Sequence, residues 1–159
     1  MILVLLGTQD KPFLRLLKMV SKEIDKGNIK EKVVAQTGYT AFSDKNMESF
    51  DFKNKEEIEK LIDKARIIIT HAGVGTITEC LEKGKKIIVV PRLKKYLEHT
   101  NDHQMQITKE FEMKGYVIAL YDKSRLSAAL DKIKTFKPKK YESNSENFRM
   151  KIKDYIDNI

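Results

Sequence analysis

Residues 66–84 read RIIITHAGVGTITECLEKG, and this stretch decides the fold that the rest of the chain has to match. The isoleucines at 67–69 form an apolar run without alternation, which is typical of a strand buried on both faces of a parallel sheet. A turn containing Gly73 and Gly75 follows, and residues 74–83 have the pattern of a helix. The stretch therefore predicts a strand, a tight turn and a helix, which together are the repeating unit of an α/β domain.

The same unit recurs on both sides of this stretch. Asn54 and Glu57 have the spacing of a capping box, which marks the start of one of the helices. Further strands are expected at 2–6, 32–36, 48–52, 86–90 and 116–120, and further helices from about 12, 54, 101 and 126. Buried strands that alternate with helices predict a Rossmann-like, doubly wound parallel sheet with helices on both faces.

A chain of 159 residues suits one domain of common size. We expect residues 1–136 to form that domain, and residues 137–159 to form a polar linker and a C-terminal amphipathic helix. The apolar stripe of this helix needs a surface to bury it, either on a partner or on its own sheet. The stripe consists of Phe148, Ile152, Tyr155, Ile156 and Ile159.

Composition excludes several classes of protein. The longest apolar run, residues 1–6, is shorter than a membrane-spanning helix of about 20 residues or a signal-peptide core of about 7–15 residues. The single cysteine, Cys80, cannot form an internal disulfide, and both observations favour a cytoplasmic protein. The net charge of +8 comes from scattered lysines, which fit a solvated surface, an anionic ligand or a membrane face. Since no nucleic-acid-binding motif occurs, nucleic acid is not an expected partner.

The turn after the isoleucine strand carries groups that can hold a ligand, since ligands bind beyond the carboxyl ends of parallel strands. Gly73 and Gly75 let the backbone approach a ligand at a helix N-terminus, where free N–H groups and the helix dipole favour phosphate. Thr76 can add a hydroxyl to the same anion, and Glu79 can accept hydrogen bonds from both ribose hydroxyls. The alternative is a turn that needs glycine only for tight packing.

Residues 101–104, Asn-Asp-His-Gln, begin the next helix and are expected to face the same crevice. An Asp or Gln there can hold sugar hydroxyls, and the alternative is simple capping by Asn101 or Asp102. His99 and His103 are four residues apart, but no His-Glu-x-x-His pattern and no Asp-x-Asp pair occur. We therefore expect no bound metal, and we expect the helix N-terminus and basic residues to neutralise a leaving diphosphate.

Two enzyme classes are poorly supported. The first strand is followed by Gly7 alone, not by the GxGxxG fingerprint of a dinucleotide dehydrogenase. Cys80 lies in the middle of a predicted helix among apolar neighbours, so we interpret it as a core residue and not as the nucleophile of a hydrolase.

Several short motifs follow one another in a specific order. They are GTQ at 7–9, PF-x-RL at 12–16, QTG at 36–38, HAG-x-GT-x-x-E at 71–79, GKKIIVVPR at 84–92 and H-x-NDHQ at 99–104. Together they resemble the glycosyltransferase family 28 C-terminal domain over about residues 1–120. The likeness is greatest for the capsular and exopolysaccharide PssE-like subunits, to which VPRLKKY at 90–96 points. The yeast Alg13 type of N-acetylglucosaminyltransferase subunit is more distant.

This resemblance implies the C-terminal half of a GT-B enzyme that is split between two chains. This half would bind a UDP-sugar and, without metal or cofactor, transfer its hexose with inversion to a lipid-linked saccharide in capsule or exopolysaccharide biosynthesis. A membrane-anchored PssD-like or Alg14-like subunit would hold the acceptor and recruit this chain to the inner face of the membrane. The donor-binding residues carried over by likeness are Gly7, Thr8, His71, Ala72, Gly73, Gly75, Thr76, Glu79, Pro91, Arg92, Asn101, Asp102, His103 and Gln104.

The resemblance also assigns roles to these residues. The glycine turn with Thr76 would hold the diphosphate, Glu79 the ribose and residues 102–104 the donor sugar. Residues 7–8 would line the cleft that faces the partner. The catalytic base is unassigned, because in such enzymes it usually belongs to the other half, and His71 is the one weak candidate in this chain.

One position departs from the family pattern. Family members often carry glycine where this chain has Leu97, which leaves open the shape of the loop before His99. Three other functions also remain open. They are an Alg13-like N-acetylglucosaminyltransferase subunit, a non-catalytic UDP-sugar-binding regulatory module, and a self-sufficient enzyme that acts as a homodimer.

Overall fold

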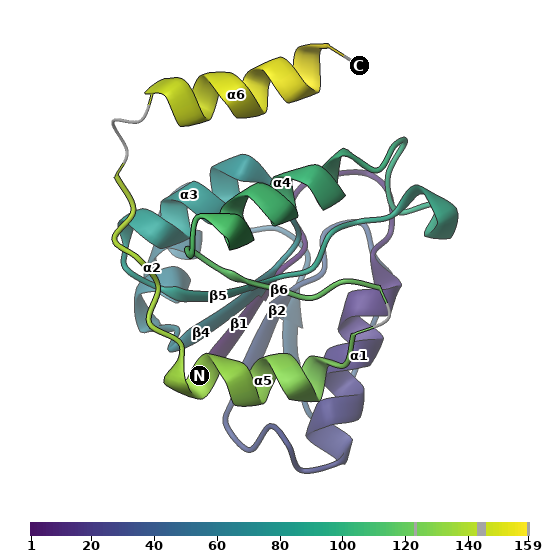
Figure 1. The fold of residues 1–159 in the computed structure, drawn as a ribbon. Helices are drawn as coiled ribbons and strands as arrows, with labels where there is room; N and C mark the ends of the chain where they lie inside the picture. The colour runs from purple at the N-terminus through teal and green to yellow at the C-terminus, as the bar shows by residue number, and fades with distance from the viewer. Residues whose placement is uncertain (123, 143–145, 159) are drawn as a thin grey trace.

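A parallel sheet lies between two layers of helices (Figure 1). The structure is a computed structural model that describes residues 1–122, 124–142 and 146–158, without the side chains of residues 146–149 and 155. Within these residues, six strands are arranged in the order β3-β2-β1-β4-β5-β6. They are β1 (Ile2–Leu5), β2 (Val33–Gln36), β3 (Glu48–Phe50), β4 (Ile67–Thr70), β5 (Lys86–Val89) and β6 (Ile118–Ala119).

The helices divide between the two faces of the sheet. One face is covered by α1 and α5, and the other by α2, α3 and α4, with α6 lying outside α4 (Figure 1). Their bounds are α1 (Leu14–Asp25), α2 (Lys55–Lys64), α3 (Val74–Glu82), α4 (His103–Met113), α5 (Leu126–Thr135) and α6 (Glu146–Asp157), and a short 3-10 helix, η1, spans Lys94–Tyr96.

The continuous apolar strands are explained by this burial on both faces. In β4, Ile67 and Ile69 pack into the core beneath α1 and α5, whereas Ile68 packs into the core beneath α2, α3 and α4. Each of these three side chains is at most 2% exposed. The predicted Rossmann-like parallel sheet is therefore confirmed.

Helix starts depend on local contacts as well as on the sequence pattern. The capping box of α2 forms as predicted: the Glu57 N–H donates to Asn54 Oδ1 at 2.9 Å, and the Asn54 N–H donates to Glu57 Oε2 at 3.1 Å. By contrast, α1 begins at Leu14, two residues later than expected. The reason is that Phe13 is fully buried and its N–H donates to Thr40 Oγ1 at 3.0 Å.

The strand order reverses between β1 and β4. From β1 the sheet extends through β2 to β3 on one side, and from β4 through β5 to β6 on the other. The loops that follow β1 and β4 therefore leave toward opposite faces of the sheet, and the crevice between them is the usual ligand position in this architecture.

The C-terminal segment packs back on the domain. The Lys139 N–H donates to the Gly115 carbonyl at 3.0 Å, and Ile152 of α6 is 4% exposed in the same core as Phe111 of α4. Ile156 is 44% exposed. Among the other residues of the predicted stripe, Ile159 and the side chains of Phe148 and Tyr155 lie outside the described part of the structure. None of the described helices combines the length and the apolar character needed to cross a membrane.

Candidate functional site

The ring of His71 lies in a narrow slot between two glycines. A β-carbon on Gly7 would lie 2.5 Å from His71 Nε2, and one on Gly73 would lie 2.2 Å from His71 Cε1. Both distances are far below van der Waals contact, so any larger residue at either position would displace the ring. The loops after β1 and β4 thus close on one imidazole at the switch point of the sheet.

The imidazole of His71 has no hydrogen-bond partner among the described residues. Both ring nitrogens are buried without one in the part of the chain that the structure describes, which is unusual for a native polar group. Burial, together with the positive charges of Arg92 and His99, lowers the pKa of His71 to about 3. A neutral ring with this pKa is a poor base at neutral pH, but its N–H can donate a hydrogen bond to an anion.

The loop after β1 is held by the loop after β2. Gly7 has a φ of 77°, and its N–H donates to the buried Gln36 Oε1 at 3.3 Å. A β-carbon on Gly38 would lie 3.0 Å from the Gly7 carbonyl oxygen, so these two glycines allow the loops to touch. Thr8 follows as an exposed residue at the rim of the crevice. The sequence analysis placed Gln36 at the end of a strand and in the QTG motif, but did not predict this supporting bond.

The two glycines of the α3 turn differ in whether packing requires them. Gly73 is the N-cap of α3, has no side-chain cap, and is required by the His71 ring. A β-carbon on Gly75 would meet nothing within 4 Å. The packing alternative therefore accounts for Gly73 but not for Gly75, which is exposed in the first turn of α3 with Thr76 beside it. This helix N-terminus, not capped by a side chain, is the anion-binding geometry predicted from the sequence.

Glu79 lies on the second turn of α3, facing α2. Together with Thr78 of the same helix and Lys55 and Glu59 of α2, it lines an open hollow of about 400 Å³. Its assignment to a ribose remains a prediction.

Gln104 has a structural role that the sequence did not reveal. Its Oε1 accepts the Ala72 N–H at 3.1 Å and the Arg92 N–H at 3.0 Å, and the residue is 6% exposed. One side-chain oxygen thus joins the loop after β4 to the loop after β5. The expected contact with a donor sugar remains a prediction for a residue whose oxygen already has two partners.

Arg92 supports the backbone of the site, and its predicted contact with the donor stays a prediction. It is 1% exposed, and its guanidinium donates to the carbonyls of Leu6 at 2.7 Å, Lys11 at 2.7 Å and Glu98 at 3.2 Å. Burial lowers the pKa of Arg92 to about 10, so it stays charged at neutral pH. The side chain points beneath the loop after β1 and supports that loop from inside. Pro91, which precedes it, is also buried.

The basic loop between Arg92 and His99 is fixed to α1 by a buried ion pair. Glu98 is 3% exposed, accepts from Arg15 Nε and Nη2 at 2.8 Å each, and also accepts the Leu93 N–H at 2.9 Å. Leu97 has a φ of 58°, the left-handed conformation that glycine adopts readily. The turn therefore forms even though leucine stands at this position.

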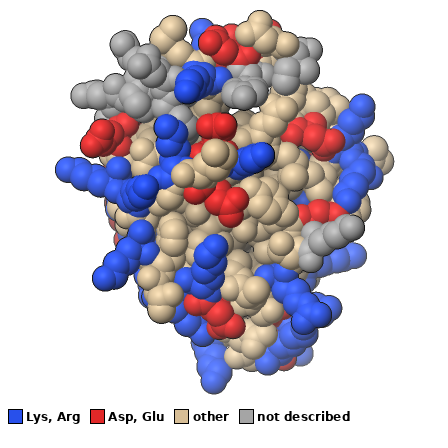
Figure 2. Space-filling view, in the orientation of Figure 1, with Lys and Arg blue, Asp and Glu red and all other residues tan. Residues whose placement is uncertain are grey.

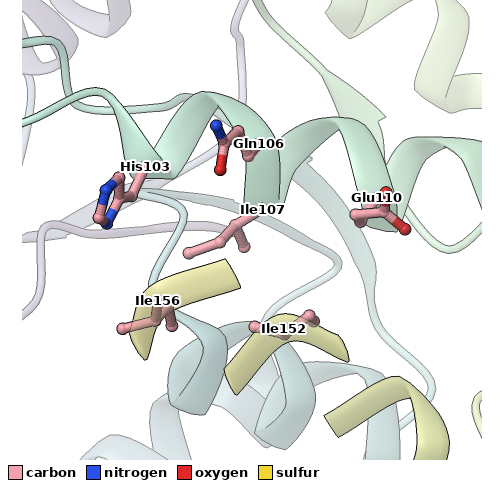
Figure 3. A pocket seen from close by; sticks show the side chains of 6 residues that line it. All are labelled: His103, Gln106, Ile107, Glu110, Ile152 and Ile156. Atoms are coloured by element: carbon pink, nitrogen blue, oxygen red, sulfur yellow. The ribbon is translucent and has the colours of Figure 1, made fainter. Parts of the chain in front are cut away.

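Residues 101–103 form the start of α4, and their polar side chains bond to nearby backbone. Asn101 Oδ1 accepts the His103 N–H at 3.1 Å, which is the capping alternative considered above. Asp102 Oδ1 accepts the Lys94 N–H at 2.8 Å and so connects η1 to α4. The His103 side chain lies at one end of a shallow apolar slot between α4 and α6, near Ile156 (Figure 3).

An exposed aromatic pair lies at the same end of the sheet. Tyr39 and Phe52 follow β2 and β3, are 59% and 42% exposed, and their ring centroids are 5.1 Å apart in an edge-to-face arrangement. A β-carbon on Gly38 would lie 3.8 Å from the Phe52 ring, so the pair adjoins the Gly7 loop. Exposed rings beside a crevice can stack on a planar ligand. The sequence carries no clear signal for this pair, because Phe42 and Phe50 lie in the same segment.

No group of three or more His, Cys, Asp or Glu side chains gathers as a metal site would, within the residues that the structure describes. The expectation of transfer without metal stays a prediction.

The helix N-terminus of α3, the His71 imidazole and the Tyr39–Phe52 pair all lie at the carboxyl end of the parallel sheet, which is where ligands bind in Rossmann-like domains. Residues 1–159 match the glycosyltransferase family 28 C-terminal domain, and the chain belongs to this family.

Curated relatives cover this chain to different extents. The UDP-N-acetylglucosamine transferase subunit ALG13 of Homo sapiens is 35% identical over 66 residues, which are 42% of this chain and 6% of the relative. The ALG13 subunit of Candida albicans is 32% identical over 81 residues, 51% of this chain and 26% of the relative. The UDP-N-acetylglucosamine–N-acetylmuramyl-(pentapeptide) pyrophosphoryl-undecaprenol N-acetylglucosamine transferase of Clostridium tetani is 31% identical over 138 residues, 84% of this chain and 34% of the relative. The chain thus spans about a third or less of the length of these relatives.

Solved structures share the fold. An NMR structure of ALG13 superposes with a TM-score of 0.58 at 18% identity, covering 95% of this chain and 94% of that one. MurG of Acinetobacter baumannii superposes with a TM-score of 0.56 at 19% identity, covering 83% of this chain and 40% of that one. The domain has the α/β fold of GT-B glycosyltransferase C-terminal halves.

Proposed function

We propose that this chain is the UDP-sugar-binding subunit of an inverting glycosyltransferase, with UDP-N-acetylglucosamine as its donor. The observation that carries the proposal is the position of His71, whose neutral ring has no hydrogen-bond partner among the described residues, beside the N-terminus of α3, which no side chain caps. Together they offer N–H donors to a diphosphate and add no negative charge.

The residues around this turn have complementary roles in the proposal. The α3 amides, the Thr76 hydroxyl and the His71 N–H bind the diphosphate and stabilise the charge that develops on it as the glycosidic bond to the leaving UDP breaks. Glu79 accepts hydrogen bonds from the ribose, and the Tyr39–Phe52 pair stacks on the uracil. No metal ion is required in this scheme.

The donor and the partner are proposed from the relatives. All three of the curated relatives described above carry UDP-N-acetylglucosamine transfer in their names. They support the N-acetylglucosaminyltransferase alternative, and none of these names refers to capsule or exopolysaccharide synthesis. Two of them are named as subunits, which supports a separate acceptor-binding chain. This partner would bring the chain from the cytoplasm to the membrane.

Calorimetry with UDP tests the binding site. Glu79→Ala should weaken UDP binding by about 1–3 kcal/mol, the cost of leaving polar partners unpaired. Glu56→Ala, which removes an exposed carboxylate from α2, is the matched control and should leave the affinity unchanged. Equal affinities of wild type and Glu79→Ala would remove Glu79 from the site.

Sugar recognition and metal use need separate measurements. Gln104→Ala should weaken binding of the whole UDP-sugar more than binding of UDP alone, and equal losses would leave Gln104 with only its loop-joining role. Donor binding and transfer should survive EDTA. Activity that is lost in EDTA and restored by magnesium or manganese would contradict the proposed diphosphate site.

Dependence on the partner is tested with UDP-N-acetylglucosamine and a membrane acceptor, with and without a co-expressed acceptor-binding chain. The chain alone should transfer little or no sugar, because positioning of the acceptor supplies much of the rate enhancement. Robust transfer by the purified chain would contradict the split-enzyme proposal. The exposed Ile156→Ser tests whether α6 docks the partner more cleanly than deletion of α6, since Ile152 belongs to the domain core.

A further inference from the structure

The surface around α1 and η1 combines positive charge with exposed apolar side chains. We call it the α1 basic face and define it by Lys18, Lys22, Lys26, Lys94, Tyr96 and Leu97. Lys18 and Lys22 lie one turn apart on the solvent side of α1, opposite the buried Leu17 and Val20. Lys and Arg side chains gather at the lower right of Figure 2, over the region where Figure 1 places α1.

Two adjoining grooves show that α1 and η1 form one continuous surface. Pro12 and Met19 of the α1 region and Tyr96 of η1 line a groove of about 550 Å³. Met19 and Tyr96 also line a second groove, of about 600 Å³, which continues to Arg125 before α5. The α1 basic face therefore has apolar floor residues between its cationic side chains.

Leu97 is held at the tip of this face at an energetic cost. It is 78% exposed, and among the described residues it is the one non-glycine residue with a positive φ. A leucine in the left-handed conformation is strained, and its exposure to water is also unfavourable. Since glycine would avoid both costs, the leucine side chain at this tip points to an apolar environment outside the domain.

The lysines of the face differ in whether the domain neutralises them. Lys26 pairs with Glu23. Beside the face, Arg15 pairs with Glu98 and Lys95 pairs with Asp122. Lys18, Lys22 and Lys94 make no ion pair within the described part of the chain. Lys18 and Lys22 line the same groove as Tyr96, Lys94 begins η1, and these ammonium groups are open to an anionic partner.

We propose that the α1 basic face binds the surface of an anionic lipid bilayer, with Leu97 and Tyr96 entering the interfacial region and the lysines contacting lipid phosphates. Lysine is depleted at protein–protein interfaces, whereas lysines beside tyrosine and an aliphatic tip suit an anionic membrane surface. The inference goes beyond recruitment by a partner subunit and does not require the proposed function. The face adjoins the loops at the carboxyl end of the sheet, so a docked chain would hold its candidate site close to the bilayer.

Vesicle co-sedimentation of the purified full chain tests the inference. The chain should bind vesicles containing phosphatidylglycerol, bind phosphatidylcholine vesicles much more weakly, and dissociate as salt rises. Lys18→Ser with Lys22→Ser should lower the partition about 25-fold, taking about fivefold for each lysine. The control pair Lys30→Ser and Lys64→Ser removes the same charge at the opposite end of the sheet and should lower it much less.

Leu97→Gly tests the apolar tip without disturbing the backbone, because glycine favours the conformation already present. It should lower the partition about tenfold, whereas the exposed Met113→Ala on α4 should not change it. If the two lysine pairs have equal effects, net charge alone explains the vesicle binding and the proposal is overturned. Failure to bind any vesicle would also overturn it. If Leu97→Gly binds vesicles like the wild type but no longer binds a protein partner, the face is a protein-binding surface and the proposal is overturned.

Discussion

The two ends of the parallel sheet treat their polar groups in opposite ways. At the amino end, the Met1 ammonium and Arg66 share the carboxylate of Glu31, and Lys85 donates to two backbone carbonyls. At the carboxyl end, a buried imidazole, His71, has no partner among the described residues. The amino end is thus completed by the chain itself, whereas the carboxyl end is left incomplete. Such concentration of unmet polar groups is typical of a functional site.

The largest expected difference between the two ends is the loss of stability on replacing Arg92 at the carboxyl end or Lys85 at the amino end. Arg92→Leu should lower the free energy of unfolding by about 4 kcal/mol, because it leaves buried carbonyls without their donor. Lys85→Met removes two hydrogen bonds at the amino end but leaves their carbonyls near water, and should cost about 1 kcal/mol. Urea denaturation measures both. Similar losses would mean that the two ends are equally supported.

The His71 slot predicts a large and reversible effect. Gly73→Ala should destabilise the domain by about 3 kcal/mol, because its new β-carbon would lie 2.2 Å from the ring. Adding His71→Ala should recover most of that loss, and Gly75→Ala should be neutral or stabilising, since that position is open. Thermal unfolding of the wild type, Gly73→Ala, His71→Ala and the double variant forms a double-mutant cycle, and Gly75→Ala is the control. A Gly73→Ala variant as stable as the wild type would disprove the slot.

Acid should weaken the domain through His71 before its carboxylates titrate. The pKa of His71 is about 3 in the folded state against 6.5 as the ordinary value, so the unfolded state binds more protons between these limits. The free energy of unfolding should therefore fall as pH drops below about 6.5, by about 1.4 kcal/mol per pH unit and about 2 kcal/mol by pH 5. His71→Ala should flatten most of this dependence, and part of the remainder should come from His99, whose pKa is also lowered by burial. An unchanged slope in His71→Ala would locate the titrating group elsewhere.

The smallest effect is expected at the strained tip. Leu97→Gly should raise the free energy of unfolding by up to about 1 kcal/mol, since relief of the left-handed strain exceeds the entropy that glycine gains on unfolding. Leu97→Ala keeps a β-carbon and should show no comparable gain. If the alanine and glycine variants are equally stable, the backbone there carries no strain.

The sequence predicted the fold well because its signals are local. A buried strand shows as an apolar run such as 67–69, and a helix start shows as a pair such as Asn54 and Glu57. The candidate site could be proposed for the same reason, since the glycine turn lies within one short segment. The supporting contacts of Arg92 could not be predicted, because two of its partners, Leu6 and Lys11, lie 86 and 81 positions earlier in the chain. No local pattern encodes such contacts.

The structural duty of Gln104 and the slot of His71 escaped sequence reasoning for a related reason. The sequence does not distinguish a glutamine that joins two loops from one that binds a sugar. Only the structure shows that the Ala72 and Arg92 N–H groups lie within hydrogen-bond distance of Gln104. Leu97 is the opposite case. Its departure from glycine was visible in the sequence, but only the backbone shows that the turn persists and carries strain.

The slot around His71 also restricts the order in which substitutions at residues 71 and 73 can occur during evolution. Gly73 has an ordinary φ of −76°, so alanine becomes acceptable there once a smaller residue replaces His71. The reverse order would pass through an overpacked and destabilised ancestor. Gly7 has a φ of 77° and stays restricted even with the ring gone. Among homologues, residues 71 and 73 should therefore vary together, with 71 changing first, while residue 7 remains glycine.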